Sequence, residues 1–148
     1  MTDRTAEHVD GDFELTSWDE NPAQDLEGTV KVATARIAQR ITGGIQAETV
    51  ADMVMTYRPD GTAEYVGHHG VLGRLGGRSG SFVLRANGTC DGSEARTEFE
   101  VIPGSGTGEL AGIAGSGSAA AGHGSTGTYS LALHIPERPS QATIGRDR

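Results

Sequence analysis

The sequence is punctuated by pairs of turn-forming residues at nearly constant intervals. The pairs are Gly43-Gly44, Asp60-Gly61, Gly76-Gly77 and Asp91-Gly92, and they stand 17, 16 and 15 residues apart. Gly-Gly and Asp-Gly supply the positive φ angles that tight hairpin turns need. The intervals leave strands of about ten to thirteen residues, which is longer than the usual five or six. The chain is therefore predicted to be a meander of long antiparallel strands.

A meander must hide its apolar face and its edges, either against a second sheet or by closing on itself. Eight strands close into a barrel just wide enough for side chains or one small ligand. We therefore predict an all-β, eight-stranded antiparallel up-and-down barrel over residues 10–135. The expected strands lie near residues 11–18, 31–41, 45–57, 62–75, 78–89, 94–102, 110–119 and 126–135.

The remaining segments are polar or rich in glycine. Residues 19–28 are acidic and turn-rich, which predicts a solvated crossover at one mouth of the barrel. Residues 103–118 predict a loop followed by a weak strand. The polar N-terminus, residues 1–9, and the proline-containing tail, residues 136–148, are predicted to be disordered.

The turn at RPDGT (58–62) sets the register of two strands. It has the pattern of a type I turn followed by a left-handed glycine, which pairs Arg58 with Thr62 and therefore Met55 with Tyr65. One face then carries an apolar set, namely Ala51, Met53, Met55, Tyr57, Tyr65, His69 and Val71. The other face carries a polar set, namely Glu48, Asp52, Thr56, Glu64, His68 and Arg74.

Other turns extend this inner face. A two-residue turn at Gly76-Gly77 pairs His69 with Leu84 and Val71 with Phe82, and a two-residue turn at Asp91-Gly92 pairs Leu84 with Phe99. A three-residue loop at 42–44 puts Ile37, Gln39 and Ile41 inside, whereas a two-residue loop would bury two arginines at a large cost. Inward residues of the last strand are Tyr129, Leu131, Leu133 and Ile135.

Two adjacent histidines are separated by this register. Neighbouring residues of a strand point to opposite faces, so His69 lies inside and His68 lies outside, opposite Asp52. A two-residue turn at Asp60-Gly61 would reverse this and scramble the apolar sets, and we reject it. Burial would lower the pKa of His69 and keep the ring neutral, as a proton acceptor. The structural alternative is a hydrogen bond from His69 to Tyr57 or Tyr65.

Small inward residues, such as Ala51 and Ala86, leave space among the larger side chains. An apolar cavity with a few convergent polar groups is the usual form of a small-molecule site. The predicted ligand-binding residues are Met53, Met55, Tyr57, Tyr65, His69, Phe82, Leu84 and Phe99, and the candidate catalytic residues are His69, Tyr65 and Tyr57.

Composition and the spacing of motifs disfavour several classes of function. A net charge of −8 disfavours nucleic acid and anionic membranes as partners. The single cysteine, Cys90, rules out an internal disulfide, and the five histidines lack metal-ligand spacing. The glycine-rich runs do not stand between a strand and a helix, so no cofactor is expected. No signal peptide or run of eighteen apolar residues is present, which predicts a cytoplasmic protein.

Five blocks of sequence carry a family resemblance: SWDENP (17–22), YRPDGTAEYVG (57–67), GRSGSFVL (77–84), VIPGSGTGELAGIAG (101–115) and GSTGTY (124–129). Together they resemble a family of small, mostly bacterial proteins of unassigned function. That family is similar in fold to allene oxide cyclase, a calycin-like barrel. The resemblance implies a Glu-Arg pair where this chain has His69-Gly70, so a carboxylate role in the family does not carry over unchanged.

Related barrels include enzymes that fold reactive or polyene substrates without a cofactor. Our first hypothesis is therefore a barrel that binds a small hydrophobic molecule and acts as a cofactor-independent cyclase or isomerase. The second is a non-catalytic carrier or sensor that uses the same lumen. The third is a packed structural barrel that acts as a homo-oligomer, with outward Val54, Val66 and Leu72 as its interface.

Overall fold

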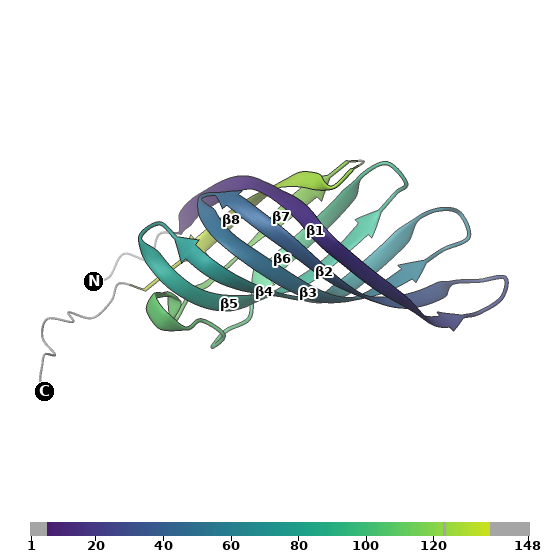
Figure 1. Ribbon diagram of the computed structural model, residues 1–148, viewed down its shortest axis with the longest axis horizontal. Coiled ribbons are helices and arrows are strands. Elements are labelled where there is room, and N and C mark those ends of the chain that lie inside the picture. Colours follow the sequence, from purple (N-terminus) through teal and green to yellow (C-terminus); the bar gives the residue numbers. More distant parts are fainter. Residues whose placement is uncertain (1–5, 123, 137–148) are drawn as a thin grey trace, which may run out of the picture.

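The computed structural model describes residues 6–122 and 124–136. As predicted, eight antiparallel strands close into an up-and-down barrel, in which each strand pairs with its sequence neighbour and β8 returns to β1 (Figure 1). The elements are β1 (Glu7–Asp25), β2 (Lys31–Gly43), β3 (Ile45–Tyr57), β4 (Ala63–Leu75), β5 (Arg78–Cys90), β6 (Ala95–Val101), the short 3-10 helix η1 (Gly108–Leu110), β7 (Ala114–Ala121) and β8 (Thr126–His134).

The registers of β3 with β4 and of β4 with β5 are those predicted from the turns. Met55 pairs with Tyr65, and His69 lies between Ala51 on one side and Leu84 on the other. The three-residue turn is closed by the Arg58 amide, which donates to the Thr62 carbonyl at 2.9 Å, with Gly61 at a φ of 93°. Along β3 the residues alternate between buried and exposed positions from Ile45 to Met55, so the inner face is the predicted one.

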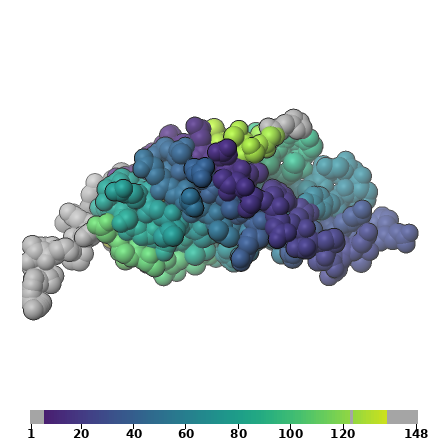
Figure 2. Space-filling view, viewed as in Figure 1, coloured from purple at the N-terminus to yellow at the C-terminus, as the bar shows by residue number. Residues whose placement is uncertain are grey.

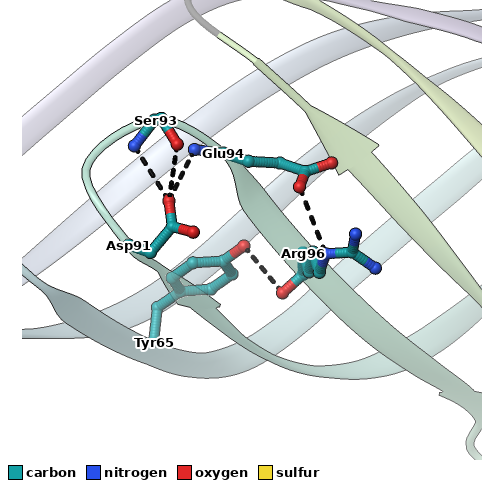
Figure 3. Close-up of polar contacts among 5 residues, drawn as sticks. All are labelled: Tyr65, Asp91, Ser93, Glu94 and Arg96. Carbon is teal, nitrogen blue, oxygen red and sulfur yellow. Dashed lines mark hydrogen bonds and ion pairs between the residues drawn. The ribbon is translucent and has the colours of Figure 1, made fainter.

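The β5–β6 register differs from the prediction by two residues. Leu84 pairs with Val101, not with Phe99, because the turn has four residues and not two. Asp91 closes this longer turn: its Oδ1 accepts the amides of Ser93 and Glu94, both at 2.9 Å (Figure 3). A shift of two residues preserves the face of every side chain, so the predicted inner set is unchanged.

The β2–β3 register is also shifted by two. The expected three-residue loop would pair Ile41 with Ile45, whereas the structure pairs Ile41 with Ala47. The hydroxyl of Tyr129 occupies the turn, accepting the Ile45 amide at 3.0 Å and donating to the Thr42 carbonyl at 2.6 Å. Again the inner face is retained, because the shift is an even number.

The crossover predicted at residues 19–28 is wrong, since β1 continues to Asp25. Beyond Glu14 this strand pairs only with β2, so the β1–β2 hairpin projects from one end of the barrel (Figure 2). The strand also begins earlier than expected, at Glu7, which pairs with Leu133. Residues 1–5 and 137–148, in the two segments predicted to be disordered, lie outside the described residues.

The two ends of the barrel are closed differently. At one end, the β6–β7 connection and its helix η1 pack Leu110 and Ile113, each 1% exposed, into a core cluster with Ile45, Leu75 and Leu133 (Figure 1). The other end carries the β1–β2, β3–β4, β5–β6 and β7–β8 hairpins. We call this second end the mouth, because the cavity described below extends to residues of its hairpins.

Candidate functional site

The barrel encloses a cavity of about 330 Å³ that runs towards the mouth. This volume is within the range of small-molecule sites, and most of the surrounding side chains are apolar. All of the predicted ligand-binding residues line it: Met53, Met55, Tyr57, Tyr65, His69, Phe82, Leu84 and Phe99. The sequence left open whether the lumen is open or packed, and the structure places open space beside these side chains.

His69 is a buried ionisable residue that lines the cavity. It is 7% exposed, and burial lowers its pKa from 6.5 to about 4, so the ring is neutral at pH 7. Its ring contacts that of Phe99 edge to face. Within residues 6–122 and 124–136, no group forms a hydrogen bond with the imidazole. The two ring nitrogens are therefore available to a molecule in the cavity.

Two further polar side chains line the cavity together with His69. Thr49 and Gln39 are neighbours in the β2–β3 ladder, and the Thr49 hydroxyl donates to the Gln39 Oε1 at 3.4 Å. Thr49 is buried and also lines the cavity, one inward position below Ala51, the strand partner of His69. The sequence analysis named Gln39 but overlooked Thr49, because a threonine among apolar strand residues gives no distinct signal. These three side chains form the deep polar cluster of the cavity.

The two tyrosines predicted to act with His69 form hydrogen bonds with other residues. The Tyr65 hydroxyl lies 2.7 Å from the Thr97 Oγ1 and donates to the Arg96 carbonyl at 3.3 Å (Figure 3). The Tyr57 hydroxyl donates to the Glu20 Oε2 at 2.8 Å. Tyr65 lies four residues from His69 along β4, a distance of about 13 Å. The structural alternative for His69, a hydrogen bond to either tyrosine, is therefore not what the described residues form.

A β-bulge in β1 brings two further residues inward, and the sequence analysis missed both. The ladder shifts between Leu15 and Ser17, so that Trp18 pairs with Ile37 and Glu20 with Ala35, two buried positions on the inner face of β2. The Trp18 indole N–H donates to the Glu20 Oε1 at 2.8 Å, and the indole lines the cavity. No alternation in the sequence marks the bulge, and these residues were assigned to a loop.

At two positions of the barrel wall, a glycine lies directly against an aromatic ring of the neighbouring strand. A Cβ at Gly88, the strand partner of Tyr65, would come within 2.5 Å of the Tyr65 ring. A Cβ at Gly127 would come equally close to the ring of Phe13, which also lines the cavity. Because glycine has no Cβ, each ring can lie close to the backbone of the neighbouring strand.

The described residues that line the cavity include no aspartate or glutamate. No lysine or arginine is among the described residues that line it. Over residues 6–122 and 124–136, no three His, Cys, Asp or Glu side chains are grouped closely enough to hold a metal ion. The described part of the chain also contains no helix with the length and hydropathy needed to span a membrane.

Comparison with known proteins assigns the chain to a family. Residues 9–133 match the family described as "Protein of unknown function (DUF3224)". The chain belongs to the DUF3224 family. A crystal structure of a DUF3224 protein of unknown function from Shewanella oneidensis MR-1 is similar to this chain, with a TM-score of 0.72 and 28% identity over 90% of this chain and 99% of that one. No curated protein matches the chain.

These comparisons confirm the predicted membership of a family of unassigned function. The likeness to allene oxide cyclase stays a prediction. The barrel, the cavity and its polar clusters are consequently the basis on which a function for this DUF3224 protein can be proposed.

Proposed function

We propose that this DUF3224 barrel binds a small, largely apolar molecule in its lumen through a hydrogen bond to His69. The observation that carries the proposal is a neutral, buried imidazole that faces an apolar cavity without a partner among the described residues. A ligand hydroxyl or carbonyl at His69 would form the hydrogen bond that no described residue forms with the ring.

The deep polar cluster also suggests which atom of the ligand lies there. Neutral imidazole offers one donor and one acceptor, and the Gln39 amide and Thr49 hydroxyl add further capacity on the same side. An uncharged oxygen can satisfy such a set, whereas a charged group would lose its hydration in an apolar lumen. The ligand is therefore an apolar molecule with an uncharged polar group at its inner end.

We favour the hypothesis of binding without turnover, as in a carrier or sensor. A histidine with a pKa of about 4 is a weak base at neutral pH, and the Tyr57 phenol, whose pKa burial and Glu20 raise to about 12, stays protonated. Cofactor-independent cyclisation or isomerisation would need the lumen to act by confining the substrate. The cavity volume argues against a fully packed structural barrel, although Val54, Val66 and Leu72 are exposed and available to an oligomer interface.

The test is a titration with the neutral fluorophore N-phenyl-1-naphthylamine. Ala119 faces the cavity, and its neighbour Ser118 faces outward, so Ala119→Phe and Ser118→Phe add the same ring inside and outside. We expect saturable binding to the wild type, at least a tenfold loss in Ala119→Phe, and a change below twofold in Ser118→Phe. Absence of saturable binding, or equal affinities of the two variants, would contradict a lumenal site.

A further inference from the structure

The mouth of the cavity holds a carboxylate between two aromatic side chains. Glu20 accepts the Trp18 indole N–H on one oxygen and the Tyr57 hydroxyl on the other, both at 2.8 Å. Trp18 and Tyr57 both line the cavity, so the Glu20 carboxylate is hydrogen-bonded to two residues of the cavity wall. We call these three residues the mouth cluster. Trp18 is 48% exposed, which leaves part of the indole open to an incoming molecule.

No ion pair within the described part of the chain balances the charge of Glu20. No lysine, arginine or histidine among residues 6–122 and 124–136 forms an ion pair with it. Arg58 and Arg96, beside two of the mouth turns, are paired with Glu64 and Glu94, and Lys31, the strand partner of Tyr57, forms no ion pair with Glu20. Further acidic residues surround the same end, on the described hairpins: Asp25, Asp60 and Asp91.

A carboxylate oxygen has two lone-pair positions, so each Glu20 oxygen keeps one after its hydrogen bond to the mouth cluster. Indole and phenol faces attract cations, most strongly when the cation is partly removed from water. A carboxylate flanked by such rings therefore offers an ammonium group both an opposite charge and a π surface. An anionic head group would meet the same carboxylate and the acidic hairpins as like charges.

We propose that the mouth cluster selects a ligand with a positively charged nitrogen, an amine or alkylammonium group, whose apolar body lies in the lumen. This proposal rests on the proposed function and adds the class of ligand. It assigns Glu20 as the residue that determines specificity, with Trp18 and Tyr57 as its aromatic neighbours. The barrel would thus discriminate against fatty acids, although its lumen is apolar enough to hold their chains.

The test compares three ligands with the same alkyl chain and different head groups. Dodecyltrimethylammonium, dodecanol and dodecanoate are each used to displace N-phenyl-1-naphthylamine from the wild type and from Glu20→Gln. Gln keeps one acceptor oxygen for the mouth cluster but no charge. Glu27→Gln is the matched control, because Glu27 is an exposed carboxylate of the β1–β2 hairpin at the same end. Thermal unfolding of each variant checks that the barrel is intact.

We expect the ammonium to bind at least tenfold more tightly than the alcohol, and the carboxylate to bind least. Glu20→Gln should remove the advantage of the ammonium and leave dodecanol within twofold of its wild-type affinity, while Glu27→Gln changes neither. Equal affinities for ammonium and alcohol, or equal effects of the two substitutions, would overturn head-group selection while leaving lumenal binding intact. If the fluorophore itself does not bind, the proposed function fails.

Discussion

His69 and Phe99 meet edge to face, with their ring centroids 5.2 Å apart and their planes at 88°. The contact joins β4 to β6 across the inner surface of the barrel, since His69 pairs with Leu84 and Phe99 with Ala86 on β5, which lies between them. Apolar contact and burial together favour the uncharged imidazole. The same residue that is available to a ligand is therefore also a source of pH-dependent stability.

Folding stability should fall as the pH drops from about 6.5 to about 4. The unfolded chain binds a proton at His69 near pH 6.5, whereas the folded chain does so only near pH 4. The contribution of His69 to the free energy of unfolding is fully present above pH 6.5 and is lost progressively below it. The loss reaches about 3 kcal/mol near pH 4. Urea unfolding across this range should show a shallower pH dependence in His69→Leu than in His68→Leu, which changes the exposed neighbour. Parallel curves for the two variants would contradict burial of His69.

Tyr129→Phe should destabilise the closed end of the barrel. The substitution removes the hydroxyl that accepts the Ile45 amide and donates to the Thr42 carbonyl, and Tyr129 is only 6% exposed. Because water does not easily replace a buried partner, we expect a loss of about 1–3 kcal/mol in the free energy of unfolding. Tyr65→Phe is the control and should cost less, since Tyr65 is only half-buried. Equal losses measured by urea denaturation would contradict this role.

Asp91→Ala should lower the melting temperature, because the Asp91 carboxylate closes the β5–β6 turn. Amide and hydroxyl donors of Ser93 and Glu94 lower its pKa to about 2. Its contribution is present above pH 3.8, the ordinary value, and is lost as the pH falls towards 2. Asp91→Asn keeps an acceptor oxygen and should retain most of the stability, without that acid dependence. Calorimetric scans that rank Asn no higher than Ala would contradict the assignment.

The architecture was predictable from the sequence because turn chemistry is local. Gly76-Gly77 and RPDGT fix their turns within a few residues, and the alternation beside them separates inner from outer side chains. Errors in loop length moved two registers, those at Asp91 and at Ile41, by two residues each. Even shifts leave the faces unchanged, so the predicted ligand-binding residues still line the cavity.

The mouth cluster was not predictable in the same way. Trp18 and Glu20 belong to an acidic stretch with the composition of a loop, and they turn inward only because of a bulge after Leu15. A bulge is decided by pairing with a neighbouring strand and leaves no period in the sequence. Glu20, the partner of Tyr57, was hidden for the same reason. The partners of Tyr65 come from β6, whose register was misplaced by two residues because the turn before it is longer than predicted.

The most direct test of a ligand at His69 is calorimetric titration of decanol into the wild type, His69→Leu and His68→Leu. Decanol carries one uncharged hydroxyl and should bind in the lumen with that hydroxyl at the deep polar cluster. Loss of one hydrogen bond predicts an affinity about three- to tenfold lower in His69→Leu, and within twofold of wild type in His68→Leu. Equal affinities of the two variants, or no binding to the wild type, would contradict a ligand site built on His69.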